Sequence, residues 1–282
     1  MLNDYWLKVK IGNQDEIDIN TITPNLHFVE LNTTPAFSNT YQSMAGVNGS
    51  IYTTGQFNKT TINLKFLVRF KDWQDLDLAK HDIYRTFLTK EIIRVRCSTA
   101  PNKVYYCRAM PFSIAPSKVG SAGAVFNVPL DNPSGLAYSI CNSDELGNLE
   151  KTDNWSFGMN LLTSTPTPYY FENMTSFKVY NPSDTDINPY LQNDSLDIKL
   201  HFKGYKYYLT NTTNGSEWHY NNPSDGTDEI LLHGVHTQKN GKPDSTSTDF
   251  GHIILDKGWN EFTIQNADIN DITFSFPFVY IA

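Results

Sequence analysis

The chain has 282 residues, of which 39% are hydrophobic and 18% charged, and its formal net charge at pH 7 is -8. No run of basic residues occurs, so specific nucleic-acid binding is not expected, because phosphate contacts need clustered Lys and Arg. Neither a membrane-length apolar run nor a secretory signal pattern is visible. Cys97, Cys107 and Cys141 are therefore expected to be free thiols, the first two buried and facing each other across a hairpin at residues 92–110.

A hairpin is predicted at residues 40–57, with Asn48-Gly49 as a two-residue loop. Pairing the strands from this loop places Tyr41 opposite Gln56. In this register both faces mix small, polar and apolar side chains, whereas a half-buried hairpin sorts them by face. Because an isolated hairpin is only marginally stable in water, we expect this one either to lie in a weakly sorted sheet or to contact another molecule.

Strict alternation over residues 61–70 predicts a strand with one apolar face. That face comprises Ile62, Leu64, Phe66, Val68 and Phe70. A helix follows over about residues 73–90, with Asp72 as its N-cap. Its expected apolar stripe comprises Leu76, Ala79 or Lys80, Ile83 and Phe87, widened by Trp73 and Tyr84. The helix is expected to cover one face of the sheet.

A cluster of turn residues at 131–135 marks the predicted boundary between a first domain, residues 1–130, and a second domain, residues 131–282. The second domain shows short strands separated by turns, which is typical of a β-sandwich. Its alternating apolar positions are Leu196, Ile198, Leu200 and Phe202, and later Ile272, Phe274, Phe276 and Phe278.

No motif indicates catalysis, since the G-x-S-x-G pattern of a nucleophile elbow is absent. His233 and His236 would point to opposite faces if they share one strand, which disfavours a metal site. The acidic segments 184–186 and 225–229 could hold Ca²⁺, but they lack EF-hand spacing and favour surface turns. We therefore expect no enzyme activity, no metal and no cofactor.

Aromatic residues of the second domain could stack on sugar rings, but core and loop packing, which large aromatic side chains dominate, is the favoured interpretation. The candidates include Tyr169 and Tyr170, and the proposed carbohydrate contacts are Trp218, Tyr220 and Trp259.

The order of these motifs resembles that of siphophage distal tail proteins. The first half matches their N-terminal domain in a hairpin around GVNGS, a strand in GQFNKTTINLKFLV, one helix and a strand hairpin. The second half resembles their C-terminal domain in WSFGMNLL, TSFKVYNPSDTDINPYL, LDKGWNEFTI and DITFSFPFVYI. The family usually has Gly-x-Asp-Gly where this chain has Gly46-Val47-Asn48-Gly49, and Asn keeps the turn chemistry.

This resemblance implies a mainly β fold: an N-terminal β-sandwich with one α-helix and a protruding hairpin arm at about residues 28–58, then a C-terminal galectin-like β-sandwich. It also implies a non-enzymatic hub of a phage tail tip, which forms a homohexameric ring with DNA passing through its central channel. The arm would supply the oligomer interface through Tyr41, Met44, Gly46, Asn48, Gly49, Ile51, Tyr52 and Phe57.

The resemblance further implies four kinds of partner: the major tail tube protein, the tape measure protein, the tail-associated lysin or fibre protein, and the receptor-binding protein. It places the protein at the virion tail tip after assembly in the bacterial host cytoplasm, without membrane insertion. The alternative hypothesis is a carbohydrate-binding adhesin. The hub depends on the arm for assembly, whereas the adhesin depends on the aromatics of the second domain.

Overall fold

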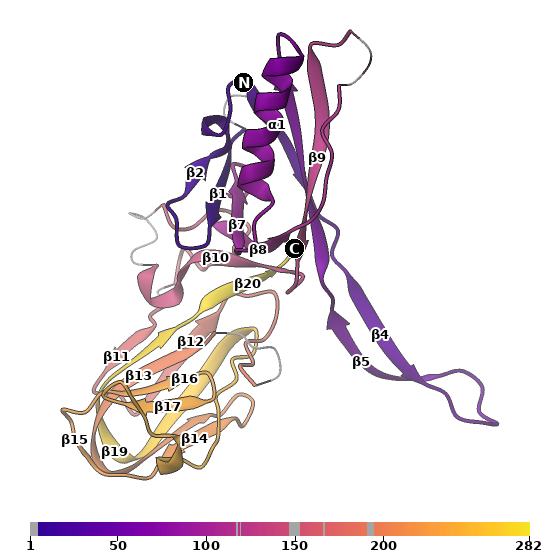
Figure 1. Ribbon diagram of the computed structural model, residues 1–282. Coiled ribbons are helices and arrows are strands. Elements are labelled where there is room, and N and C mark those ends of the chain that lie inside the picture. The colour runs from indigo at the N-terminus through magenta and orange to yellow at the C-terminus, as the bar shows by residue number, and fades with distance from the viewer. Residues whose placement is uncertain (1–4, 117, 119, 147–152, 166, 191–194) are drawn as a thin grey trace. The chain divides into compact units, whose positions relative to one another are not determined.

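The computed structural model describes residues 5–116, 118, 120–146, 153–165, 167–190 and 195–282. The fold is mainly β, as the sequence predicted, with α1 as the one α-helix of the described residues (Figure 1). Two compact units make up the chain, unit 1 with Met1–Ala137 and Ile281–Ala282, and unit 2 with Tyr138–Tyr280. No helix of the described part is long and apolar enough to span a membrane.

Unit 1 contains one antiparallel sheet in which strands distant in sequence become neighbours, in the order β2-β1-β7-β8-β9-β6-β3. Its elements are β1 (Leu7–Ile11), β2 (Ile17–Asp18), the 3-10 turn η1 (Ile19–Thr21), β3 (Leu26–Asn32), β6 (Thr60–Arg69), α1 (Trp73–Phe87), β7 (Ile93–Cys97), β8 (Lys103–Ala109) and β9 (Gly123–Asn132). The predicted alternation of β6 is confirmed, because every second side chain from Ile62 to Val68 is fully buried.

Helix α1 begins where the sequence predicted, since the Asp72 side chain accepts a hydrogen bond from the Asp75 backbone N–H at 2.8 Å. Its buried stripe comprises Leu76, Ala79, Ile83 and Phe87. The Phe87 ring packs against Phe66 of β6 at a centroid distance of 5.8 Å, so the helix covers this part of the sheet. Trp73 does not widen the stripe: it is the first helical residue and is 71% exposed.

A charged cluster holds the β2 segment against β1 and β7. Lys8 and Lys10 of β1 lie directly opposite Arg96 and Arg94 of β7, an arrangement of like charges that costs stability. Glu16 offsets this cost by accepting hydrogen bonds from Arg94 Nη2 and Arg96 Nε, both at 2.9 Å. The hydrogen bond from Arg96 contributes most to holding the pKa of Glu16 below its ordinary value, against a smaller opposing effect of burial.

Unit 2 is built on a second antiparallel sheet, with the order β11-β19-β13-β16-β17-β18, and β12, β14 and β15 pair along its long strands. Its elements are β10 (Leu136–Asn142), η2 (Ser143–Glu145), β11 (Tyr170–Glu172), β12 (Ser176–Asn181), β13 (Asp197–Asn211), β14 (Glu217–Tyr220), β15 (Ser224–Asp225), β16 (Ile230–His233), β17 (His236–Lys239), β18 (Lys242–Pro243), η3 (Ser245–Ser247), β19 (Gly258–Ser275) and β20 (Pro277–Ile281).

The two apolar stretches predicted for the second half are confirmed as core. All eight side chains are 0–2% exposed, those from Leu196 to Phe202 and those from Ile272 to Phe278. Long β13 and β19 pair along most of their length, with register shifts that let the sheet bend. The strands β10 and β20 pair with each other and not with this sheet.

Candidate functional site

The candidate site is the arm, defined as residues 37–57, which contains β4 (Phe37–Gln42) and β5 (Ile51–Phe57). Among the described residues these strands pair only with each other, and Figure 1 shows them as a separate two-stranded ribbon. Every residue of the arm is exposed except Gly55 and Phe57, which are half-buried. A two-stranded ribbon with this exposure has little of its own to stabilise it.

The register predicted for this hairpin is wrong. Tyr41 lies opposite Tyr52 instead of Gln56, and Phe37 lies opposite Phe57. A two-residue type I′ loop needs a positive φ at both central residues. Gly49 has a φ of 87°, but Asn48 does not adopt a positive φ, so this turn does not form. The loop instead runs over residues 43–50, which shifts the pairing.

The true register gathers the aromatic side chains of the two strands on one face, which the register predicted from the sequence did not. The aromatic face carries Phe37, Tyr41, Tyr52 and Phe57, together with Asn39 and Gly55, and the polar face carries Ser38, Thr40, Thr54 and Gln56, with Gln42 and Ile51 at its end next to the loop. On the aromatic face the rings meet in two edge-on pairs. The centroids of Phe37 and Phe57 are 5.1 Å apart, and those of Tyr41 and Tyr52 are 6.1 Å apart.

Gly55 lies between these two ring pairs, on the same face. A Cβ at this position would lie 2.5 Å from Phe37 Cζ and 2.8 Å from the Tyr52 hydroxyl oxygen. Only a residue without a side chain therefore lets both rings lie across the strand. The result is a continuous aromatic surface along β4 and β5.

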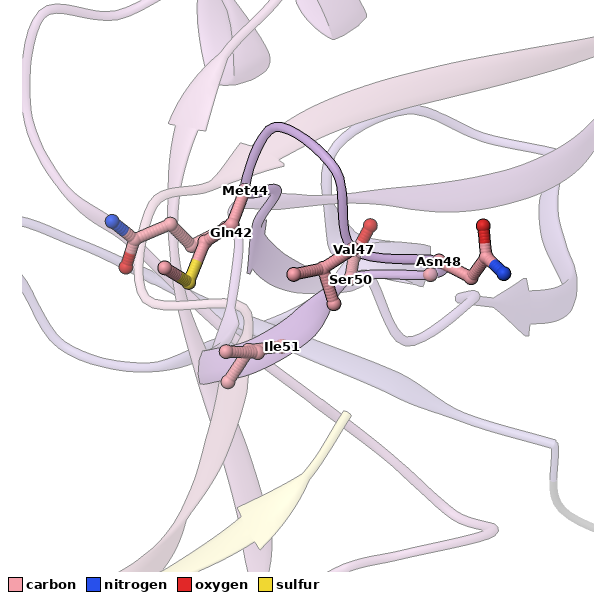
Figure 2. Close-up of a pocket in the computed structure, with 7 residues that line it drawn as sticks. Gln42, Met44, Val47, Asn48, Ser50 and Ile51 are labelled. Atoms are coloured by element: carbon pink, nitrogen blue, oxygen red, sulfur yellow. The ribbon is translucent and has the colours of Figure 1, made fainter.

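The loop at the tip of the arm carries a second apolar group. Met44, Val47 and Ile51 surround a hollow of about 70 Å³, and Asn48 points away from it (Figure 2). These three side chains are 57–59% exposed. The Ser43 and Ser50 hydroxyls lie 3.1 Å apart at the base of the loop, and Gly46 has a φ of 81°, which favours glycine.

The arm also lacks charged side chains, and the sequence itself carries this signal of an interface. From Leu31 to Asn58 the chain contains no Asp, Glu, Lys, Arg or His, although 18% of the whole chain is charged. Cores of protein–protein interfaces are depleted of charge and enriched in aromatic residues and Met. An exposed segment with this composition has the chemistry of a protein interface.

The candidate carbohydrate contacts are mostly inaccessible, which contradicts a sugar platform at these residues and agrees with the favoured interpretation of core packing. Trp218 and Tyr220 are 0% exposed, because β14 places them in the core of unit 2. The Trp218 indole N–H donates to Thr237 Oγ1 at 3.2 Å. Trp259 is 38% exposed, but its ring packs against Tyr180 at 5.0 Å. Neither Trp218 nor Tyr220 offers a ring face to a sugar.

His233 and His236 do not share one strand, so the condition on which their opposite orientation depended is not met. They lie opposite each other at the ends of β16 and β17, across a two-residue turn, and both are exposed. His233 Nδ1 lies 2.5 Å from Asp197 Oδ1, so its nearest partner is a carboxylate. No group of three or more His, Cys, Asp or Glu in the described part of the chain could hold a metal ion.

The acidic side chains of segment 225–229 form contacts that stabilise the turn in which they lie. Asp225 accepts hydrogen bonds from the Thr227 backbone N–H and hydroxyl, at 3.0 and 2.6 Å. These bonds lower the pKa of Asp225, with the hydroxyl contributing most. Asp228 forms an ion pair with Lys239 at 2.7 Å. Both carboxylates are therefore engaged in local turn contacts.

The predicted contact between Cys97 and Cys107 does not form. Cys97 lies opposite Leu7, and Cys107 lies opposite Ile93. Both are buried and free, as predicted for each one separately. Burial raises the pKa of the Cys107 thiol to about 12, so this side chain is protonated and packs as an apolar group.

The chain is similar to one known protein family and to solved structures, and both similarities are to phage tail proteins. Residues 12–130 match the family model described as a phage tail protein RIFT-related domain. The Dit protein of phage SPP1, described as a paradigm of the hub adsorption apparatus of phages that infect Gram-positive bacteria, has a similar structure. The match has a TM-score of 0.68 at 13% identity and covers 96% of this chain and 99% of that protein.

A chain of the activated baseplate of phage p2 matches with a TM-score of 0.45 at 12% identity, over 98% of both chains. No curated protein matches this sequence. The family-model match over residues 12–130 and the structural match to the SPP1 protein confirm the resemblance to distal tail proteins. The structural match shows a similar fold over nearly the whole chain.

Proposed function

Because residues 12–130 match the model of a phage tail RIFT-related domain, we propose that this protein is the structural hub of a phage tail tip. The SPP1 protein with the same fold is described as part of a hub adsorption apparatus, which supports this role. As a hub, the protein acts at the virion tail tip and is assembled in the cytoplasm of the bacterial host. Its role is structural and not enzymatic.

In this proposal six copies form a ring through the arm. Each copy presents its arm to the next copy, so the contact is head-to-tail and closes by rotation. The contact residues proposed from the sequence are Tyr41, Met44, Gly46, Asn48, Gly49, Ile51, Tyr52 and Phe57. Four of them, Tyr41, Met44, Ile51 and Tyr52, are large apolar side chains that are more than half exposed and available for such a contact.

The ring joins the tail tube on one side to the adsorption apparatus on the other. Its proposed partners are the major tail tube protein, the tape measure protein, the tail-associated lysin or fibre protein and the receptor-binding protein. DNA passes through the central channel without specific binding, which agrees with the formal net charge of -8.

The exposed, uncharged arm is the observation that carries this proposal. A monomer with such a ribbon would expose large apolar side chains without compensation, whereas a ring covers one arm at each contact. None of the core residues of unit 1 belongs to the arm. Removing the arm is therefore expected to leave the fold of unit 1 intact.

The test is deletion of residues 38–56, with a short Gly-Ser linker between Phe37 and Phe57, which lie opposite each other. The expected result is a folded monomer where the full chain forms a ring. The matched control replaces Trp73, which is 71% exposed outside the arm, by Ala and should leave the ring intact. A deletion variant that still forms a ring would show that the arm is not the interface.

A further inference from the structure

We infer that the aromatic face of the arm, and not its polar face, forms the centre of the surface by which one copy binds the next. The inference rests on the proposed ring and identifies the side chains that form its contact. It follows from the register of β4 and β5, which the sequence alone did not reveal.

The aromatic face has the composition and exposure of an interface centre. Phe37, Tyr41 and Tyr52 are 54–58% exposed in the isolated chain, although each carries a large apolar ring. Aromatic residues dominate the binding energy of interfaces when a partner covers them fully. Because Gly55 leaves room for the rings, they form one broad surface that a partner can cover at once.

Burying the polar face against a partner would not be favourable in the same way. Asn58 Nδ2 donates to Ser38 Oγ at 2.9 Å, and Gln56 Nε2 donates to Asn58 Oδ1 at 3.4 Å. These side chains already satisfy part of their hydrogen-bonding capacity within the ribbon, and water can satisfy the rest. Burying them against a partner would require new hydrogen bonds for each group that loses water.

The uncharged arm allows a second copy of this chain to be the occupant. Two copies with a net charge of -8 each repel one another over most of their surfaces. A contact through the uncharged segment between Leu31 and Asn58 avoids placing like charges close together. One arm per copy also matches a closed ring, in which each contact uses one arm and none remains uncovered.

The test compares lysine substitutions at adjacent positions that lie on opposite faces. Tyr41→Lys and Tyr52→Lys alter the aromatic face, and Thr40→Lys and Thr54→Lys alter the polar face at neighbouring rungs of the ladder. All four variants add the same charge to exposed positions of the arm. Sedimentation velocity over a range of protein concentrations measures assembly, and circular dichroism checks that each variant is folded.

The aromatic-face variants should raise the concentration for half-assembly by about tenfold or more, the effect of losing an interface anchor. The polar-face variants should change it by less than about threefold, as at an interface rim. Conservative Tyr41→Phe and Tyr52→Phe variants should assemble normally, because the rings remain. This last pair separates loss of the aromatic surface from loss of the hydroxyl group.

Two outcomes would overturn the inference, and only the second would also overturn the ring proposal. If the wild-type chain assembles but the polar-face variants dissociate as readily as the aromatic-face variants, the choice of face is wrong and the ring proposal stands. If the wild-type chain is monomeric at every concentration, the ring proposal fails, and the inference fails with it.

Discussion

Tyr41 lies directly opposite Tyr52 in the β4–β5 ladder, with ring centroids 6.1 Å apart and ring planes at 70°. This pairing depends on a register shift: Thr40 pairs with Thr54, and the ladder passes over Thr53 before Tyr41 meets Tyr52. Without the extra residue, Tyr52 would fall on the polar face. The bulge therefore brings both tyrosines to the same face as Phe37.

Gly55→Ala is expected to weaken ring assembly without unfolding the protein. The new Cβ would lie 2.5 Å from Phe37 Cζ, so the ring must move and the aromatic face is disrupted. Gly55 does not have a positive φ, so Ala causes no backbone strain. We expect a several-fold higher concentration for half-assembly, on the scale of a lost ring contact, with an unchanged melting temperature. Thr54→Ala on the polar face is the matched control and should assemble as the wild type does.

Salt should not dissociate the ring. The arm has no charged side chain, so the contact contains no ion pair from this side, and added salt screens the repulsion between chains of net charge -8. Light scattering at about 0.05 M and about 0.5 M NaCl, where screening differs strongly, is the measurement. We expect equal or stronger assembly at the higher salt concentration. Dissociation at high salt would indicate that ion pairs elsewhere on the chain hold the ring together.

Trp218→Ala is expected to destabilise unit 2, because Trp218 is 0% exposed and packs between Tyr207 and Tyr220. Removing a buried aromatic side chain costs about 3–5 kcal/mol. Calorimetry should show a lower melting temperature for the transition of this unit. The control is Trp259→Ala, at a partly exposed site, which should cost about 1 kcal/mol, the usual effect of a substitution. Equal losses in the two variants would contradict the burial described.

Glu16→Gln should destabilise unit 1 at neutral pH and lose its effect in acid. The pKa of Glu16 is lowered in the folded protein, so its contribution is present above the unfolded pKa of about 4.3 and is lost as the pH falls through the lower folded value. Hydrogen bonds to charged groups contribute about 1.5–3 kcal/mol.

Urea denaturation at pH 7 and at about pH 3, below the ordinary glutamate pKa, measures this difference. The wild type and the variant should differ most at pH 7, and the difference should shrink as the pH falls toward the lowered folded pKa. Lys59→Ala is a useful control, because its ion pair with Asp131 is solvent-exposed and should contribute less than about 1 kcal/mol. A difference for Glu16→Gln that is independent of pH would contradict the ionic role of Glu16.

Local rules predicted the elements of this fold well. The alternation in β6 and the Asp72 cap depend on neighbouring residues, so the sequence reveals them directly. The register of the arm could not be read in this way. Asn48-Gly49 indicated a two-residue loop, but the backbone of Asn48 does not adopt the required conformation, and no sequence pattern marks the bulge at Thr53.

Exposure was the second quantity that the sequence did not determine. Trp218 and Trp73 are both large aromatics next to strand or helix patterns, yet the first is fully buried and the second is 71% exposed. Their burial depends on which elements pack against them, which is a property of the whole fold. The lack of charge between Leu31 and Asn58, in contrast, can be read directly from the sequence and is its strongest signal for the proposed interface.

The mass of the purified protein in solution, measured by light scattering on a sizing column, tests the central claim most directly. The account predicts a mass of about six times the 32.1 kDa of one chain, or twice that value if two rings associate. A mass of one chain at every concentration tested would contradict it.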